Sequence, residues 1–363
     1  MTRNELQLQV ANILEKDKRL ICTWGTGTGK SGIVMKFLER HPDFRTLILV
    51  PEQNNIQNWR DEFSKFGVFD FGVDIACYAS FHKYENTKWD FVCFDEAPHV
   101  NTDKRLNICY SVKADYILAL GAVITDEQIQ SLQFAYGLFA KSHFGLDDAI
   151  DAGILPTPTI KVLHMQLDDK EAVYKDKKGV YTAKRYYEIL NKKIKDAVTA
   201  YNLKSSYKNK MNMLRLGGER KRFLGKQKDI AIKRICSTLD EKKKRFLCFC
   251  SSIQQAEQLG GEYAFTSKTP SSFKLLDRFN DGEISSLYVV GKLIEGQNLK
   301  NIECGIIGQL GGTDRITIQS IGRIMRSKNP IIYVLMFDET KDVGFLKTLT
   351  ENISKDYIKH YKF

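Results

Sequence analysis

The stretch TWGTGTGKS (residues 23–31) combines three alternating glycines with a lysine and a serine. It follows the apolar run RLICT (residues 19–23) and precedes GIVMKFLER (residues 32–40), which favours a helix. A glycine-rich turn between a strand and a helix directs unpaired backbone N–H groups and the positive end of the helix toward one point. The stretch therefore predicts a phosphate-binding loop at the end of a buried strand.

The residue types in this loop indicate how a nucleotide is held. Lys30 is predicted to reach the terminal phosphates, and the Ser31 hydroxyl to hold Mg²⁺. The expected nucleotide contacts come from Gly25, Thr26, Gly27, Thr28, Gly29, Lys30 and Ser31. Against the pattern G-x-x-x-x-G-K-[ST], the first position is Trp24 rather than glycine, which makes the match less specific. The alternative is an ordinary glycine-rich turn.

An acidic pair ends a second apolar run, DFVCFDEAPHV (residues 90–100). Asp95 is predicted to anchor Mg²⁺ through water, and Glu96 to orient and deprotonate the attacking water. Alone, such a pair is equally typical of a solvated loop. Combined with the phosphate loop, it predicts ATP and Mg²⁺ as cofactors and Ser31 and Asp95 as the metal ligands.

Apolar and β-branched runs alternate with helical patterns in two series, which indicates parallel sheets flanked by helices. The first series is RLICT, TLILV, VDIACY, FVCF and YILAL, and the second is RFLCFC, SLYVV, CGIIGQL and IIYVLMF. We expect an α/β fold with one domain over residues 1–153 and another over residues 236–363. Residues 154–235 are expected to form a basic, mostly helical connector with a break at Gly217 and Gly218.

The charge balance favours a polyanionic partner. The 363 residues include 55 Lys and Arg against 44 Asp and Glu, which gives a net charge of +11. The connector is rich in lysine and tyrosine, so it is either a solvated helical face or a flank for nucleic acid. In the second case its cations neutralise phosphates while Tyr186, Tyr187 or Tyr207 stack on bases.

The remaining composition argues against other classes of protein. The eight cysteines form no C-x-x-C pair and lie mostly in apolar runs, so we expect buried, reduced thiols without zinc or disulfides. The first residues show no secretory signal, and no apolar stretch has the roughly 18 residues of a membrane span. We therefore expect a soluble, cytoplasmic protein.

A third motif lies near the end of the chain, in TIQSIGRIMRS (residues 317–327). It matches Q-x-x-G-R-x-x-R through Gln319, Gly322, Arg323 and Arg326. A helix places two arginines three residues apart on one face, from which planar guanidinium groups can reach a γ-phosphate. Alone, this pattern is typical of a solvated basic helix.

In chain order, these motifs resemble those of superfamily 2 helicases and nucleic-acid translocases. The phosphate loop is similar to motif I, DEAPH to the DEAD/DEAH box, and the arginine segment to motif VI. Further segments are similar to motifs Ia, Ib, III, IV and V: TLILVPEQNNIQNW (residues 46–59), YASFHKY (78–84), ALGAVIT (119–125), RFLCFCSSIQQAEQL (245–259) and VVGKLIEGQNLKNIECGII (289–307). The closest resemblance is to DNA-directed, DEAH-box-like members, including compact phage-type ones.

The resemblance implies two RecA-like domains facing each other across an ATP cleft. It implies Glu96, Gln319, Arg323 and Arg326 as catalytic residues, and Pro51, Ser80 and Lys83 as contacts to nucleic acid. An adenine-reading glutamine falls in NELQLQVA (residues 4–11), as Gln7 or Gln9. Two positions depart from the family: Asn298 replaces a common aspartate, and Pro98 displaces His99 within the box, so no role is carried over to His99.

We therefore expect an ATP-dependent DNA helicase or translocase. DNA is favoured over RNA because the chain resembles the DNA-directed subgroup and because no RNA-helicase glutamine motif with its upstream aromatic is evident. The alternatives are an RNA helicase, an ATP-gated nucleic-acid clamp, and another P-loop ATPase without unwinding activity. We favour a monomer without membrane attachment and leave protein partners open. A phage-encoded chain would act in the host cytoplasm.

Overall fold

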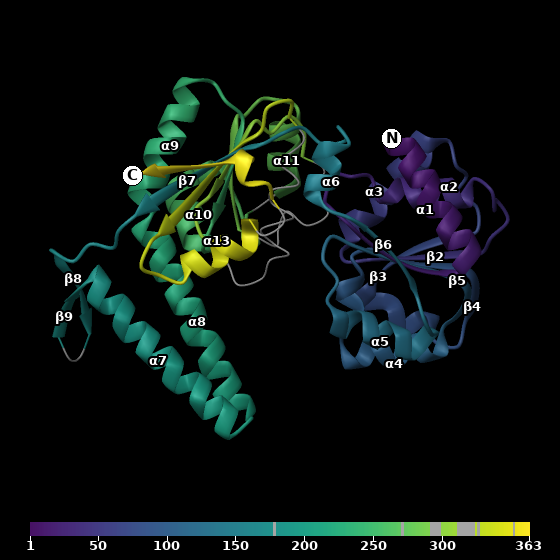
Figure 1. Ribbon diagram of the computed structural model, residues 1–363, viewed down its shortest axis with the longest axis horizontal. Helices are drawn as coiled ribbons and strands as arrows, with labels where there is room; N and C mark the ends of the chain where they lie inside the picture. The colour runs from purple at the N-terminus through teal and green to yellow at the C-terminus, as the bar shows by residue number, and fades with distance from the viewer. Residues whose placement is uncertain (177–178, 270–271, 291–298, 311–323, 325–326, 351–352) are drawn as a thin grey trace. The chain divides into compact units, whose positions relative to one another are not determined.

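The computed structural model describes residues 1–176, 179–269, 272–290, 299–310, 324, 327–350 and 353–363 (Figure 1). The described chain divides into two compact units. The first is built from Met1–Thr157, and the second from most of the residues that follow.

A six-stranded parallel sheet in the order β3-β2-β4-β5-β1-β6 forms the centre of the first unit. Its strands are β1 (Arg19–Trp24), β2 (Thr46–Val50), β3 (Val73–Cys77), β4 (Lys88–Phe94), β5 (Lys113–Gly121) and β6 (Ala140–Phe144). Its helices are α1 (Arg3–Asp17), α2 (Ser31–Leu38), α3 (Gln53–Phe66), α4 (Asp103–Ser111), α5 (Asp126–Tyr136) and α6 (Leu146–Asp151). One apolar core packs α1, α2 and α3 against the sheet, and a second packs α4 and α5 against the opposite face.

A seven-stranded parallel sheet in the order β11-β12-β10-β13-β14-β7-β15 forms the second unit. Its strands are β7 (Thr159–Met165), β10 (Phe246–Cys250), β11 (Ala264–Phe265), β12 (Ser286–Val290), β13 (Cys304–Ile307), β14 (Ile331–Phe337) and β15 (Ile358–Lys362). The helices beside it are α9 (Asp229–Glu241), α10 (Ile253–Gly260), α11 (Ser272–Asn280) and α13 (Asp342–Thr350). The expected α/β fold with two parallel sheets is confirmed.

Two long helices, α7 (Ala183–Leu203) and α8 (Tyr207–Gln227), lie side by side and extend away from the second sheet (Figure 1). We call this pair the arm. A two-stranded antiparallel ribbon of β8 (Ala172–Asp176) and β9 (Gly179–Thr182) precedes it. The segment expected as a connector thus contains β7, a strand of the second sheet. The division at residues 153 and 235 stays a prediction.

The expected break at Gly217 and Gly218 is wrong, because both residues lie inside α8. Glycine in a helix interior costs about 1 kcal/mol relative to alanine. Packing of α8 along α7 and burial of nearby side chains such as Leu216 and Phe223 offset that cost.

The expected stacking tyrosines differ in exposure. Tyr187 is 6% exposed and its hydroxyl accepts from the Lys341 backbone N–H, so it is not available to stack on a base. Tyr186 packs against Tyr174 and Phe223, whereas Tyr207, near the tip of the arm, is 79% exposed.

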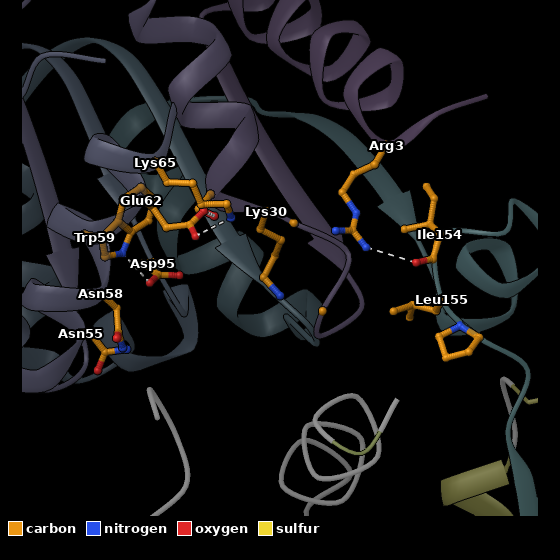
Figure 2. A pocket seen from close by; sticks show the side chains of 14 residues that line it. Arg3, Lys30, Asn55, Asn58, Trp59, Glu62, Lys65, Asp95, Ile154 and Leu155 are labelled. Atoms are coloured by element: carbon orange, nitrogen blue, oxygen red, sulfur yellow. Dashed lines mark hydrogen bonds and ion pairs between the residues drawn. The ribbon is translucent and has the colours of Figure 1, made fainter. Parts of the chain in front are cut away.

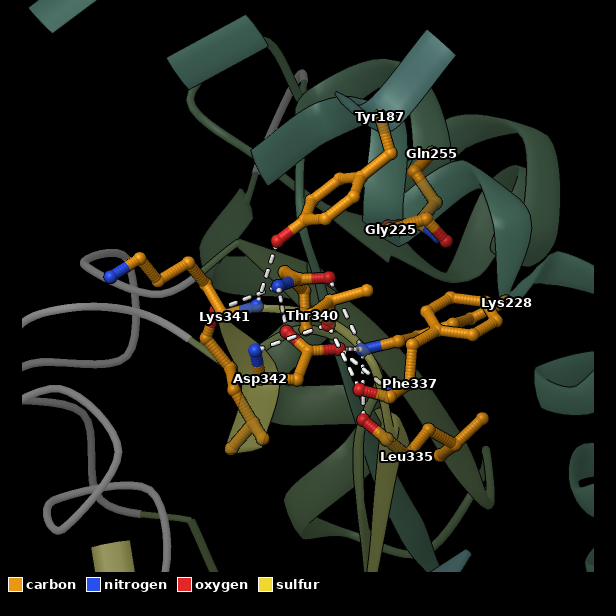
Figure 3. A network of polar contacts seen from close by, with 11 residues as sticks. Tyr187, Gly225, Lys228, Gln255, Leu335, Phe337, Thr340, Lys341 and Asp342 are labelled. Carbon is orange, nitrogen blue, oxygen red and sulfur yellow. Dashed lines mark hydrogen bonds and ion pairs between the residues drawn. The ribbon is translucent and has the colours of Figure 1, made fainter. Parts of the chain in front are cut away.

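A buried polar network holds the arm to the second sheet (Figure 3). Lys228, between α8 and α9, is fully buried and donates to the Asp342 carboxylate at 2.7 Å, the Leu335 carbonyl at 2.8 Å and the Gln309 side chain at 3.3 Å. Asp342 also accepts from Gln309 Nε2 at 3.1 Å and from the Phe337 N–H at 3.2 Å. The network therefore joins the base of the arm to β13, β14 and α13.

Seven of the eight cysteine side chains are buried, and Cys77 is partly exposed. No helix among the described residues is long and apolar enough to cross a membrane.

Candidate nucleotide-binding site

A cavity of about 590 Å³ lies within the first unit, beside the loop that follows β1 and the end of β4 (Figure 2). The loop, one face of α3 and the segment after α6 line it. The lining residues are Arg3, Gly27, Gly29, Lys30, Ser31, Asn55, Asn58, Trp59, Glu62, Lys65, Asp95, Ile154, Leu155 and Pro156. The structure thus brings together five of the predicted site residues: Gly27, Gly29, Lys30, Ser31 and Asp95.

The loop backbone requires its glycines. Gly27 has φ of 87° and Gly29 has φ of 92°, in the left-handed region that glycine adopts without steric cost. A Cβ on Gly29 would lie 2.7 Å from Gln7 Nε2. The buried Thr28 hydroxyl donates to the Gly25 carbonyl at 2.7 Å, whereas the buried Thr26 Oγ1 has no partner among the described residues. The loop is therefore shaped by glycine and by internal hydrogen bonding.

Of the two candidate glutamines, Gln7 contacts the phosphate loop. Its Nε2 donates to the Gly29 carbonyl at 2.7 Å, and the residue is 4% exposed. A Cβ on Gly32 would overlap the Gln7 amide, so α1 and α2 meet closely here. Gln9 is exposed. A role of Gln7 in reading adenine stays a prediction.

Trp24 has a packing role in place of the consensus glycine. It is fully buried as the last residue of β1, and its ring lies 5.3 Å from that of Phe144 in the neighbouring strand β6. Its Nε1 donates to Ser142 Oγ at 3.0 Å. The large side chain points into the core, so it leaves the following loop intact.

Lys30 points into the cavity (Figure 2). Its Nζ donates to the carbonyls of Trp24 at 3.1 Å and Gly25 at 3.5 Å. Both partners belong to neutral backbone groups of the loop, and an anionic phosphate is a stronger acceptor for an ammonium group. This lysine is therefore placed to exchange loop carbonyls for a ligand.

The Asp95 carboxyl is fixed by bonds on both its side chain and its backbone. Trp59 Nε1 donates to Asp95 Oδ2 at 2.9 Å, and the Tyr78 hydroxyl donates to the Asp95 carbonyl at 2.9 Å. Burial, and next the charge of Glu96, raise the pKa of Asp95 to about 6, while the Trp59 bond and Lys30 oppose this rise. At neutral pH the group is a carboxylate facing the cavity.

Glu96 and His99 follow outside this cavity lining. Glu96 has φ of 49° and ψ of 57°, a left-handed conformation that is uncommon for a residue with a side chain. The His99 ring stacks on Tyr78 at a centroid distance of 6.0 Å, and Arg105 donates to the His99 carbonyl at 2.5 Å. His99 therefore packs as part of the support for the acidic pair.

The other predicted residues lie elsewhere. Pro51 follows β2, and Ser80 and Lys83 lie in the 3₁₀ helix Tyr78–Tyr84 that follows the adjacent strand β3. None of these three lines the cavity. Gln319, Arg323 and Arg326 lie outside the described residues, as does Asn298.

Sequence reasoning missed the contribution of α3. Asn55, Trp59 and Glu62 all line the cavity, and their spacing of four and then three residues places them on one helix face. The sequence shows this spacing, but the spacing alone does not distinguish a helix face toward a ligand from one toward water.

Comparisons with known proteins bear on the chain as a whole and on its fold. No protein-family model matches the chain. It is similar to the DNA 3'-5' translocase XPB2 of Sulfurisphaera tokodaii, with 22% identity over 367 residues that cover 90% of this chain and 79% of that protein. Its fold is that of the helicase domain of Hef from Pyrococcus furiosus, with a TM-score of 0.60, 14% identity, and coverage of 94% of this chain and 96% of that one.

Proposed function

We propose that this superfamily 2 helicase-like protein hydrolyses ATP to move along or remodel DNA. The observation that carries the proposal is the convergence of Lys30, Ser31 and Asp95 on one cavity. The similarity to a DNA translocase over 90% of the chain supports DNA as the polymer.

The cavity residues fit ATP with Mg²⁺. The loop N–H groups and Lys30 are suited to the phosphates, and the unpartnered Thr26 hydroxyl adds a polar group in the same loop. Ser31 Oγ and the Asp95 carboxylate offer the oxygen ligands that Mg²⁺ prefers. When bound, the cation neutralises charge on the phosphates.

Hydrolysis requires further residues. We assign Glu96 to orient and deprotonate the attacking water, and Gln319, Arg323 and Arg326 to stabilise charge on the γ-phosphate. An arginine finger typically contributes about 10³ to 10⁵ in rate. The coupling of nucleotide state to domain geometry stays a prediction.

The arm supports binding to a polyanion. Residues 183–227 contain thirteen Lys or Arg and three Asp or Glu, so they carry +10 of the chain's net +11. Such a surface binds phosphates with little sequence preference and strong dependence on salt. We add Pro51, Ser80, Lys83 and the exposed Tyr207 as nucleic-acid contacts.

The test measures ATP hydrolysis without polymer and then with single-stranded DNA, duplex DNA or RNA, with Lys30→Ala as the blank. We expect DNA to stimulate hydrolysis, less so as salt rises. Stimulation by RNA alone would favour the RNA helicase. Binding of DNA without turnover would favour the clamp, and no stimulation by any polymer would favour a different P-loop ATPase.

A further inference from the structure

Helix α3 reaches both oxygen groups that we assign to Mg²⁺. Trp59 and Glu62, three residues apart, point from this helix toward the cavity (Figure 2). Trp59 Nε1 donates to Asp95 Oδ2 at 2.9 Å, and Ser31 Oγ donates to Glu62 Oε2 at 2.8 Å. One helix face therefore holds both groups, although Ser31 and Asp95 follow different strands.

The two contacts differ in chemistry. A serine hydroxyl has one proton and two lone pairs, so donating the proton to Glu62 directs the lone pairs away from that carboxylate. An indole N–H can only donate, so Trp59 fixes Oδ2 of Asp95 as an acceptor. The carboxyl also accepts from the Glu96 backbone N–H, and its two oxygens together offer about four acceptor sites, so lone pairs remain for a cation. Each contact thus restricts the rotation of the Ser31 hydroxyl or the Asp95 carboxylate while leaving a lone pair of that group for a cation.

Glu62 is itself held in place. Its Oε1 accepts from Lys65 Nζ at 3.0 Å, one turn further along α3, and its side chain is 30% exposed. Trp59 is 4% exposed and packs in the apolar core between α3 and the sheet. A half-buried carboxylate beside the Ser31 hydroxyl also adds negative charge that attracts a divalent cation.

We infer that Glu62 is a positioning residue for the Mg²⁺ of the nucleotide site: it orients the Ser31 hydroxyl, and with Trp59 it makes α3 the support of both metal ligands. The inference rests on the proposed function. The competing account is a surface glutamate paired with Lys65, and that account predicts no effect on metal binding.

The test titrates Mn²⁺ into the full chain at saturating ADP and follows free Mn²⁺ by electron paramagnetic resonance. Removing a group that orients a metal ligand typically costs 10- to 100-fold in metal affinity. We expect Glu62→Leu to weaken Mn²⁺ binding by about that factor, and Glu62→Gln, which keeps an acceptor for Ser31, to recover part of the loss. Binding of ADP in EDTA should stay unchanged in both variants.

Asp61→Leu is the matched control. Asp61 is the neighbouring acid on the same helix, is exposed, accepts from Gln57 and does not line the cavity, so its loss should leave Mn²⁺ affinity unchanged. Wild-type affinity in Glu62→Leu would overturn the inference and leave the proposed function intact. Loss of ADP binding in EDTA would assign Glu62 to the fold instead. Failure of the unmodified chain to bind ADP or Mn²⁺ would overturn both.

Discussion

Two lysines, one in each unit, show opposite uses of the same side chain. Lys30 lies beside a cavity of about 590 Å³ and donates to two backbone carbonyls of its own loop. Lys228 is fully buried, and its three partners, Asp342, Leu335 and Gln309, use all three of its N–H donors (Figure 3). Lys30 can exchange its carbonyl partners for a ligand, whereas every N–H of Lys228 is committed to a partner within the fold.

The electrostatics of the two sites follow from this difference. Burial lowers the pKa of Lys228, and the Asp342 carboxylate opposes that shift. A buried ion pair offsets its desolvation only when the remaining donors and acceptors are satisfied, as they are in this network. In the first unit, Lys30, Glu62 and Asp95 face a cavity, so their charges are available to a ligand.

Replacing Lys30 should give the largest effect, and it should fall on turnover. We expect Lys30→Ala to abolish measurable DNA-stimulated ATP hydrolysis, because the terminal phosphates lose their cation. The free energy of unfolding should change by only about 1 kcal/mol, the net contribution of a typical hydrogen bond, since the Gly25 carbonyl keeps its bond from the Thr28 hydroxyl. Turnover assays check the loss of hydrolysis, and urea titrations check the free energy of unfolding. Wild-type turnover in Lys30→Ala would show that Lys30 has no role in hydrolysis.

Replacing Lys228 should instead lower the stability of the fold. We expect Lys228→Met to lower the free energy of unfolding by about 3–5 kcal/mol, because Asp342 is left as a buried charge without its counter-ion. Far-UV circular dichroism during urea unfolding measures the loss. A change below about 1 kcal/mol would show that the pair behaves like an exposed one.

The double variant Lys228→Met with Asp342→Asn separates the lost charge pair from lost packing. Asparagine has one acceptor oxygen, which keeps the bond from the Phe337 N–H, and its NH2 group can donate to the Gln309 side-chain oxygen that Lys228 no longer occupies once that amide turns. The buried charge therefore disappears while both neighbours keep a partner. We expect it to recover most of the stability lost in Lys228→Met. No recovery would assign the loss to packing of the lysine side chain.

The smallest effect concerns Asp95 and pH. Its pKa is raised from 3.8 to about 6, so the folded chain binds this proton more tightly than the unfolded chain does. Stability is therefore lost as pH rises from about 4 through about 6, by at most about 3 kcal/mol. In EDTA, Asp95→Asn should be more stable than the unmodified chain at pH 7.5 and about equal to it at pH 4.

Tryptophan fluorescence during urea unfolding measures this difference locally, because Trp24, Trp59 and Trp89 all lie in the first unit. An equal difference between the two chains at both pH values would show that the Asp95 carboxyl has an ordinary pKa in the folded state.

Much of the fold was predictable because the central strands are apolar runs. RLICT, TLILV and RFLCFC lie in the strands β1, β2 and β10. Two edge strands were missed: β6 and β15 read AKSHF and IKHYK, whose polar residues do not differ from those of a loop. Tertiary packing, which the local pattern does not show, also keeps Gly217 and Gly218 helical.

The site was predictable where chemistry is local to one motif. Lys30 and Ser31 lie in one loop, and Asp95 ends an apolar strand, so their roles could be proposed from spacing. The roles of Glu62 and Lys228 could not be proposed from the sequence, because a charged residue in a polar stretch gives the same pattern whether it faces water, a cavity or a buried partner. Burial and the partner across the fold decide its role.

The position of strand β7 in the chain delays assembly of the second sheet during synthesis. Its Thr159 pairs with Ile331 of β14, and its Ile160 pairs with Ile358 of β15, so both neighbours are translated long after it. At translation rates of 5–20 residues per second, β7 waits roughly ten to thirty seconds for β14. The first sheet has all its strands by then. During that interval β7 is an apolar strand with two unpaired edges, the kind of segment that associates with other chains. Shortened chains that end before β14 should therefore aggregate on translation, whereas the first sheet should already be assembled.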